Sequence, residues 1–350
     1  MLRISAMILA LALVSACGGG GSNPLQNTEE EETDTDTDTD TDTGTDSDPI
    51  DGGRNLPPGT ANPSPNTAIV RYEDPDGSTD GAGTVTNVEY DPEDIGADVF
   101  LVDGLPFDGN NIYTRGTAVD QLGSYAVYES DPAGEFHNRA IYGVSDSGTT
   151  EFIVVRPTDY NSYGFRGFIY QRNGGVNLPT TGTAIYTGDY AGVRVYQGVQ
   201  SLDYVTGDAE MVIDFEDFDD ALGTTLRIRN RRLYDLNGND VTSEYLDALM
   251  DDNTNGIRPT ATNGTDDALP DIAPVIRNNG GDSNGEIVNG VYTQLYQIDD
   301  TPTRLSDGEY YAIVAGENAD EVVGVLVMTG TDPRHSVPFE ETGGFILTSP

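Results

Sequence analysis

The sequence has no lysine and no tryptophan, and it holds a single cysteine and two histidines. So few thiol and imidazole groups argue against a metal enzyme with Cys or His ligands and against thiol or histidine-triad catalysis. All 17 basic residues are arginine, and they face 60 Asp and Glu residues, so the formal net charge is −43. Because phosphate binding needs clustered cations, this balance also argues against nucleic acid as a partner.

The N-terminus has the features of a secretory signal that ends at a lipid-attachment site. Arg3 gives a short positive region, and the apolar stretch over residues 6–14 is too short to span a bilayer as a mature helix. One apolar residue and two small residues then precede Cys17. This order resembles the bacterial lipobox, in which the cysteine is acylated and becomes the first residue of the mature protein.

We therefore predict a signal peptide over residues 1–16 and a palmitate-type lipid anchor on Cys17; an ordinary secretory signal with an incidental cysteine is the alternative. Several acyl chains on one residue give stable anchoring, because each buried CH₂ contributes about 0.8 kcal/mol. Gly18 stands where an inner-membrane retention signal usually carries Asp. This position favours the outer membrane.

Residues 17–66 are predicted to form a flexible, acidic tether. Four glycines over 18–21, four Glu over 29–32 and Thr–Asp alternation over 33–43 leave almost nothing apolar to bury. Ordering such a segment has no hydrophobic compensation, and its like charges extend it. A calcium-binding array is the alternative, although no Gly turn punctuates the Asp spacing as calcium loops require.

The acidity continues beyond the tether. Residues 67–350 hold 48 acidic residues and 15 arginines, a net charge of −33. Self-repulsion of this size destabilises a compact domain unless salt screens it. A salty habitat explains the excess more simply than a cationic partner, which stays as the alternative.

The part of the chain after the tether is predicted to be all-β. Runs with period-two alternation recur between clusters of Gly, Asp, Asn and Pro. Met211, Ile213 and Phe215, for example, share one face of a strand, which indicates one buried side. The predicted strands cover residues 67–72, 83–90, 99–102, 111–119, 124–129, 140–144, 151–156, 165–172, 183–187, 192–196, 209–215, 224–234, 274–277, 286–297, 309–314, 322–329 and 345–347.

Residues 243–250 suggest the one helix, with Leu246, Leu249 and Met250 on one face. The glycine-rich second half predicts a closed sheet, because Gly marks the bulges and bends that let a sheet curl and remove its edges. About eight strands in about 170 residues suit an up-and-down barrel with a side-chain-filled interior.

Three segments of the second half carry a family resemblance. Residues 178–188 (LPTTGTAIYTG), 207–215 (GDAEMVIDF) and 310–324 (YYAIVAGENADEVVG) keep their order, spacing and strand placement. Together, over residues 178–330, they resemble the β-barrel of transferrin-binding protein B and its lipoprotein relatives. Two features depart from that pattern. Residues 313–316 replace a Phe-Tyr-Gly turn, and the loop over 235–285 is long and acidic.

The resemblance implies a handle-like β-sheet over residues 67–177, followed by an eight-stranded antiparallel barrel over 178–350. It also implies a surface-exposed, lipid-anchored binding module that outer-membrane export machinery carries to the cell surface. Members of this family capture iron-carrier, complement and haem proteins. Transferrin is not implied as the ligand here, because variable loops carry recognition in the family and fold does not fix function.

One acidic loop has spacing that suits a metal ion. Asp74, Asp76, Ser78 and Asp80 place oxygens at alternating positions around Gly turns, and Ca²⁺ takes six to eight oxygen ligands. The loop lacks the bidentate Glu that ends an EF-hand loop, and Asp-Gly runs also form plain turns. Residues 235–240 and 251–256 raise the same question with less force. No cofactor is predicted, and Ca²⁺ at these loops is the alternative.

A cluster of arginines stands out in so acidic a chain. Arg227, Arg229 and Arg231 alternate, so we expect them on one face of a strand. Pairing with acidic residues such as Glu210 on the preceding strand is the simpler interpretation, and a grip on an anionic ligand is the alternative.

The aromatic residues and the histidines point to structural roles. Most of the 19 tyrosines, such as Tyr186 and Tyr196, alternate within strands and are expected to pack. His137 and His335 are expected in solvated turns, with ligation of haem iron as the alternative.

These patterns together predict a lipid-anchored surface protein that captures a protein or a metal- or haem-bearing solute through barrel and handle loops, without catalysis. A structural or adhesive cell-surface lipoprotein, with or without calcium, is the second hypothesis. A carboxylate-based extracellular hydrolase is the third, and the sequence contains no Gly-x-Ser-x-Gly elbow and no P-loop.

Replacing Cys17 by Ala removes the acylation site, so the protein is expected to move from the membrane fraction to the soluble fraction. Immunoblots of fractionated cells measure this, with Gly18→Ala as a control that keeps the cysteine. A Cys17→Ala protein that stays in the membrane fraction would contradict the lipobox interpretation.

Overall fold

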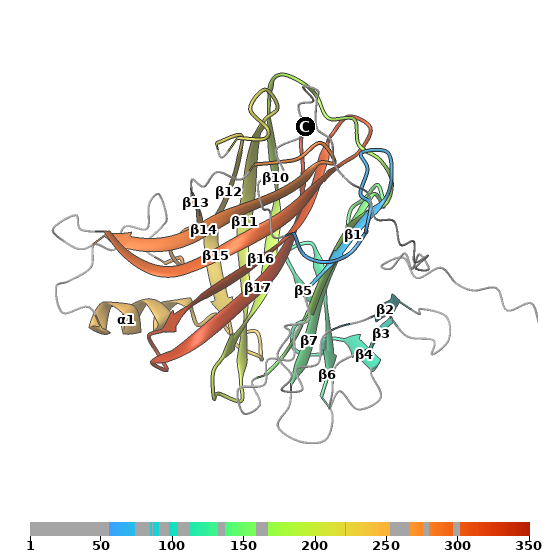
Figure 1. Ribbon diagram of the computed structural model, residues 1–350. Coiled ribbons are helices and arrows are strands. Elements are labelled where there is room, and N and C mark those ends of the chain that lie inside the picture. The colour runs from blue at the N-terminus through green and yellow to red at the C-terminus, as the bar shows by residue number, and fades with distance from the viewer. Residues whose placement is uncertain are drawn as a thin grey trace, which may run out of the picture.

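Two curled antiparallel sheets pack against each other in the computed structural model of the protein (Figure 1). The structure describes residues 56–73, 85, 87–90, 98–103, 112–131, 137–158, 167–220, 222–252, 267–275, 280–296 and 302–350. The predicted signal peptide, Cys17 and the tether up to residue 55 lie outside these residues. The architecture confirms the predicted all-β class, in which a handle-like sheet precedes an eight-stranded antiparallel barrel.

The handle-like sheet is formed by the first nine strands. Its order is β1-β9-β8-β7-β6-β4-β3-β2, with β5 paired to β6, so the chain winds across the sheet and β9 returns beside β1. The strands are β1 (Ile69–Tyr72), β2 (Asn87–Tyr90), β3 (Val99–Asp103), β4 (Ile112–Arg115), β5 (Gln121–Leu122), β6 (Tyr125–Ser130), β7 (Asn138–Val144), β8 (Thr150–Pro157) and β9 (Gly167–Arg172).

The barrel is formed by the remaining strands in the order β12-β11-β10-β17-β16-β15-β14-β13. Backbone bridges from Ile228 to Ile272 and from Arg231 to Leu269 join the segment before β13 to β12 and close the barrel. The strands are β10 (Thr183–Tyr196), β11 (Leu202–Asp214), β12 (Thr224–Tyr234), β13 (Ala273–Val275), β14 (Glu286–Tyr296), β15 (Pro302–Ala315), β16 (Glu321–Asp332) and β17 (Val337–Thr348).

Three apolar clusters hold the two sheets. One fills the barrel, the second lies between the barrel and the handle-like sheet, and the third covers the other face of the handle-like sheet. Strand β8 takes part in two of them: Phe152 and Val154 face the barrel, whereas Ile153 and Val155 face away. All of its residues are buried, which explains the unbroken apolar run over residues 152–155 at its centre.

Buried arginines tie the handle-like sheet and the N-terminal segment to the barrel. The guanidinium of Arg71 on β1 meets the carboxylate of Glu286 on β14 through two hydrogen bonds, of 2.6 and 2.8 Å. Arg172 on β9 donates instead to four main-chain carbonyls, two of them in residues 64–67 and two, of Asn284 and Val314, in the barrel. Burial lowers the pKa of Arg172 to about 10, so it stays cationic at neutral pH.

A buried ion cluster lies inside the barrel. The carboxylate of Glu341 on β17 accepts hydrogen bonds of 2.7 Å from Arg194 on β10 and from Arg231 on β12, and one of 2.9 Å from the hydroxyl of Tyr190. Glu341 is fully buried. Burial by itself raises the pKa of this carboxyl, but the two guanidinium groups outweigh it and hold the pKa at about 2.

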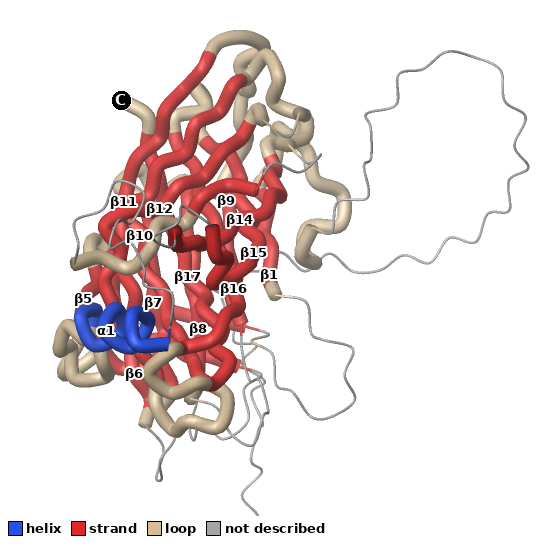
Figure 2. Tube along the Cα trace, turned by 90° about the vertical axis from the view of Figure 1, so that its left-hand side faces the viewer, coloured by secondary structure: helices blue, strands red, loops and turns tan. Residues whose placement is uncertain are grey.

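The predicted helix is present as α1 (Thr242–Asp252), beside the ends of the barrel strands (Figure 2). Tyr245 and Leu249 are buried in the barrel cluster, whereas Met250, which was expected on the same face, is 44% exposed. The ring of Tyr245 lies 5.3 Å from the Arg194 guanidinium. The helix therefore covers the ion cluster at this end of the barrel.

Replacing Glu341 by Gln leaves two buried guanidinium groups without their carboxylate, so we expect the free energy of unfolding to fall by about 3–5 kcal/mol at pH 7. Chemical denaturation measures this, with Glu317→Gln at an exposed position as the control.

The same substitution has a defined pH dependence. Because the pKa of Glu341 is lower in the folded state, its stabilisation is complete above the unfolded value of about 4.5 and is lost as the pH falls towards 2. The stability gap between the native protein and Glu341→Gln should therefore close below pH 4.5. A gap that does not change with pH would contradict the ion cluster.

Candidate functional site

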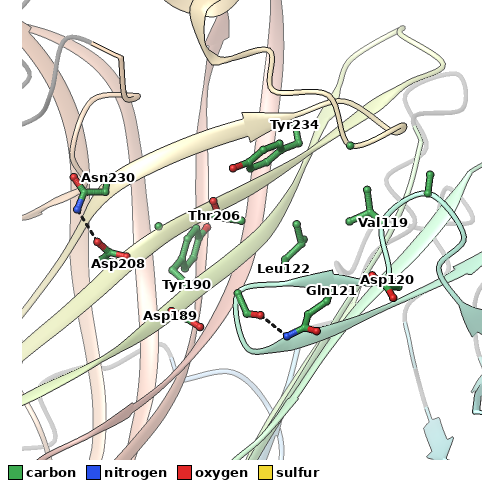
Figure 3. A pocket seen from close by; sticks show the side chains of 14 residues that line it. Val119, Asp120, Gln121, Leu122, Asp189, Tyr190, Thr206, Asp208, Asn230 and Tyr234 are labelled. Atoms are coloured by element: carbon green, nitrogen blue, oxygen red, sulfur yellow. Dashed lines mark hydrogen bonds between the residues drawn. The ribbon is translucent and has the colours of Figure 1, made fainter.

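A cleft of about 430 Å³ lies at the junction of the two sheets. Its handle side is the turn and short strand over residues 118–123, and its barrel side comes from β10, β11, β12 and the turn at Gly238. Figure 3 shows Leu122 on one side of this space and Tyr234 on the other. We call this space the junction cleft.

An irregularity in the barrel shapes one wall of the junction cleft. The register between β11 and β12 shifts at residues 206–208, and Asn230, opposite this point, has a left-handed backbone with φ of 52°. A β-bulge of this kind re-aims the side chains that follow it. The side-chain amide of Asn230 donates a hydrogen bond of 2.6 Å to the Asp208 carboxylate, and both residues line the cleft (Figure 3).

The bulge also corrects the expectation for the arginine cluster. Arg227 and Arg229 lie on the outside of the barrel, and Arg229 pairs with Glu210 at 3.6 Å. Arg231 instead turns into the barrel and binds Glu341, because the extra residue at Asn230 breaks the alternation. The three arginines therefore do not share one face.

Gly207 is required where the bulge meets the junction cleft. A Cβ at this position would lie 2.7 Å from a methyl of Ile228 and 3.0 Å from the carbonyl oxygen of Arg229. Both contacts are too close for any other residue without movement of β12. The glycine therefore lets β12 approach β11 closely enough to form the wall.

Hydrogen bonds between the two sheets fix the lining in place. The Asp189 carboxylate accepts the backbone N–H of Ser124 at 2.7 Å, and the hydroxyl of Tyr125 donates to the Asp189 carbonyl at 2.7 Å. The same hydroxyl accepts the N–H of Ile346 at 2.8 Å, so Tyr125 joins β6 to β10 and β17. On the handle side, the amide of Gln121 donates to the carbonyl of Gly123 (Figure 3).

The chemistry of the junction cleft comes from oxygen-bearing groups. Asp120, Asp189 and Asp208 supply carboxylates, and Tyr190 and Tyr234 supply aromatic rings. The described residues of its lining include no Ser, Cys, His, Lys or Arg, so they supply no serine or cysteine nucleophile with a histidine base. In the described part of the chain, no cluster of three or more His, Cys, Asp or Glu side chains could hold a metal ion.

Of the three calcium candidates, the turn over residues 235–240 is the one that is fully described, and its Gly238 lines the junction cleft. Asp74, Asp76, Ser78 and Asp80 lie outside the described residues, as does most of the loop over 251–256. In the turn over residues 235–240, the Asp235 carboxylate accepts the backbone N–H groups of Asn237 and Asn239. That carboxylate is therefore held by the turn itself.

His137, His335, Tyr186 and Tyr196 are not among the described residues that line the junction cleft. His137 faces the Asp131 carboxylate at 3.3 Å, and the ring of His335 meets that of Tyr196 edge-on at 5.3 Å. Tyr186 and Tyr196 are buried, as their alternation predicted.

The residues that line the cleft were not singled out from the sequence. The handle-side residues lie about 65 to 120 positions before the barrel-side residues, and no local pattern marks them as neighbours. The Gly207–Asp208 pair within a strand was the available signal, because glycine inside a strand often marks a bulge.

No protein-family model and no curated protein matches the sequence. Solved structures with some similarity include a transferrin-binding protein B mutant from Haemophilus parasuis, with a TM-score of 0.33, 13% identity, and coverage of 72% of this chain and 40% of that one. Transferrin-binding protein B from serogroup B Neisseria meningitidis has a TM-score of 0.33 and 12% identity, and the match covers 73% of this chain and 40% of that one. A surface lipoprotein has a TM-score of 0.24 and 12% identity, and the match covers 60% of this chain and 80% of that one.

The chain thus spans about two fifths of the length of the transferrin-binding protein B structures that it matches. The resemblance is distant and is one of fold alone. Within the residues that the structure describes, no helix is both long enough and apolar enough to cross a membrane.

The bulge can be tested at Asn230. Asn230→Gly and Asn230→Val both lose the hydrogen bond to Asp208, but only Val must hold a β-branched side chain at positive φ. We expect Asn230→Val to be less stable than Asn230→Gly by about 1 kcal/mol in chemical denaturation. Equal stability of the two variants would contradict the left-handed backbone at this position.

Proposed function

We propose that the protein is a lipid-anchored cell-surface binding protein that captures a protein or a solute at the junction cleft, without catalysis. The observation that carries this proposal is the cleft itself, a lined space of about 430 Å³ where two sheets meet. Binding sites for small groups are clefts of about 300–1,000 Å³ with a few placed polar side chains, and they favour junctions between domains.

The lining is fixed before any ligand arrives. Asp189 forms hydrogen bonds with Ser124 and Tyr125 across the two sheets, and Asp208 forms one with Asn230 within the bulge. Strand β10, which carries Asp189, is paired on both sides, to β11 and β17. A site whose groups are already in position loses less conformational entropy when it binds, which supports capture.

The described end of the tether is attached outside the lining of the junction cleft. Residues 56–67 are bound to β9 and the barrel by Arg172, and the N–H of Val176 donates to the carbonyl of Pro65 at 2.6 Å. None of these residues lines the cleft. In the proposed arrangement, acylated Cys17 and the acidic tether hold the protein on the outer face of the outer membrane after export.

The haem-bearing and metal-bearing ligands suggested by the sequence receive no support from this site. Neither His137 nor His335 is among the described residues that line the junction cleft. The proposal therefore rests on hydrogen-bonding and apolar contacts with a ligand that brings its own charge.

Filling the junction cleft should abolish capture. Ala118 is exposed on its handle side, so Ala118→Trp places an indole ring in the space, whereas Leu222→Trp adds the same ring at an exposed turn of the barrel. Cells that display the native protein or Leu222→Trp are expected to retain the same component of the growth medium. Ala118→Trp should retain about tenfold less.

Mass spectrometry of the retained material measures this outcome, after immunoblots have shown equal display of the three proteins. Capture by Ala118→Trp at the native level would place the binding surface elsewhere and refute the proposed site.

A further inference from the structure

We infer that the junction cleft binds an organic cation, a guanidinium or ammonium group on an aliphatic stem. This inference rests on the proposed function and names the chemistry of its ligand. Three carboxylates, of Asp120, Asp189 and Asp208, line the same space, and no cationic side chain is among the described residues that line it. Like charges around one cavity repel each other, and a bound cation relieves that repulsion.

The carboxylates of the junction cleft keep acceptor capacity for a ligand. The side-chain hydrogen bonds of Asp189 and Asp208 use one carboxylate oxygen each, to Ser124 and Asn230 respectively. Within the described part of the chain, Asp120, Asp189 and Asp208 form no ion pair. A carboxylate accepts through about four lone-pair positions, so most of the acceptor capacity of these side chains is not used within the protein.

The arginines nearest to the junction cleft are engaged elsewhere. Arg229 pairs with Glu210, Arg231 is buried on Glu341, and Arg232 pairs with Asp240 and Asp267. Arg115 reaches Asp120 through the main-chain carbonyl, at 2.8 Å, and its Nη1 faces Asp98 at 3.3 Å. The chain has no lysine, so it supplies no flexible ammonium group either. The cleft carboxylates are therefore left for a cation from outside.

The arrangement suits an organic cation better than a metal ion. A calcium ion draws its oxygen ligands to about 2.3–2.6 Å around one point. Asp120, Asp189 and Asp208 are spread around a cavity instead, and no metal-holding group of three acidic side chains occurs among the described residues. A cation with its charge on a longer molecule can contact carboxylates at separate positions.

Apolar side chains complete the match. Val119 and Leu122 are nearly buried on the handle side, and Tyr234 presents a half-buried ring from β12. Alkyl stems of basic side chains pack on apolar surface while their charged heads stay with polar groups, and a tyrosine ring attracts a nearby cation. Two sources carry this chemistry, a diffusible polyamine and a basic side chain of a protein.

The experiment is calorimetric titration of the full chain with two probes, spermidine and a hexa-arginine peptide, at low and physiological salt. The test variant replaces Asp120, Asp189 and Asp208 together by Asn. The control variant replaces Asp217, Asp219 and Asp220, three exposed carboxylates at the β11–β12 turn, by Asn. Both variants change the net charge equally and keep the acidic tether, so they cancel non-specific attraction.

The native protein and the control variant are expected to bind at least one probe with a stoichiometry of one, and the test variant about tenfold more weakly or not at all. Binding of spermidine alone identifies a diffusible cation as the source, and binding of the peptide alone identifies a protein side chain. Equal binding by the test and control variants, or binding of neither probe, overturns the inference.

A second variant guards against misfolding. Asp120→Asn changes an exposed side chain with no ion pair, so if the triple variant fails to fold, a roughly threefold loss of affinity in Asp120→Asn supports the inference and an unchanged affinity overturns it.

The proposed function and this inference fail separately. Loss of capture in Ala118→Trp without cleft-dependent cation binding refutes the cation alone. Cleft-dependent cation binding with unchanged capture by Ala118→Trp refutes the capture site and leaves the cation inference standing.

Discussion

Burial of arginine is the constraint on which the rest of the structure depends. The chain has 17 arginines against 60 acidic residues, yet Arg71, Arg172, Arg194 and Arg231 lie inside the protein. A buried charge is tolerated only where it is paired and hydrogen-bonded, so each of these side chains specifies its own partners. Two of them bind one carboxylate, Glu341, inside the barrel. The others join the handle-like sheet and the N-terminal segment to the barrel.

This use of arginine decides the character of the outer surface. The arginines that pair with buried groups cannot also neutralise acidic residues on the outer surface. The surface therefore stays negative, and its long-range attraction favours cationic partners. The bulge at Asn230 connects the two effects. It turns Arg231 inward onto Glu341, and it presents Asp208 and Asn230 to the junction cleft. The hydroxyl of Tyr190 reaches the same ion cluster from the lining of the cleft.

Local patterns in the sequence were enough to predict the fold class. Alternation placed Met211 and Ile213 inside the barrel, and the spacing of Leu246 and Leu249 indicated α1. The site could not be predicted in the same way, because its geometry comes from long-range pairing. Nothing near Asp189 indicates that it faces Ser124, and the pair formed by Arg71 and Glu286 joins residues 215 positions apart. The inward turn of Arg231 depends on one bulge residue, which strict alternation does not reveal.

The proposed ligand is held at the junction of the two sheets. Hydrogen–deuterium exchange of the full chain, with and without the captured component, tests it most directly because it reports every backbone segment at once. Protection of backbone amides against exchange is expected to increase at residues 118–124, 187–190 and 206–208, around the junction cleft. Protection confined to the barrel-end hairpins over 197–201 and 332–337 would contradict it.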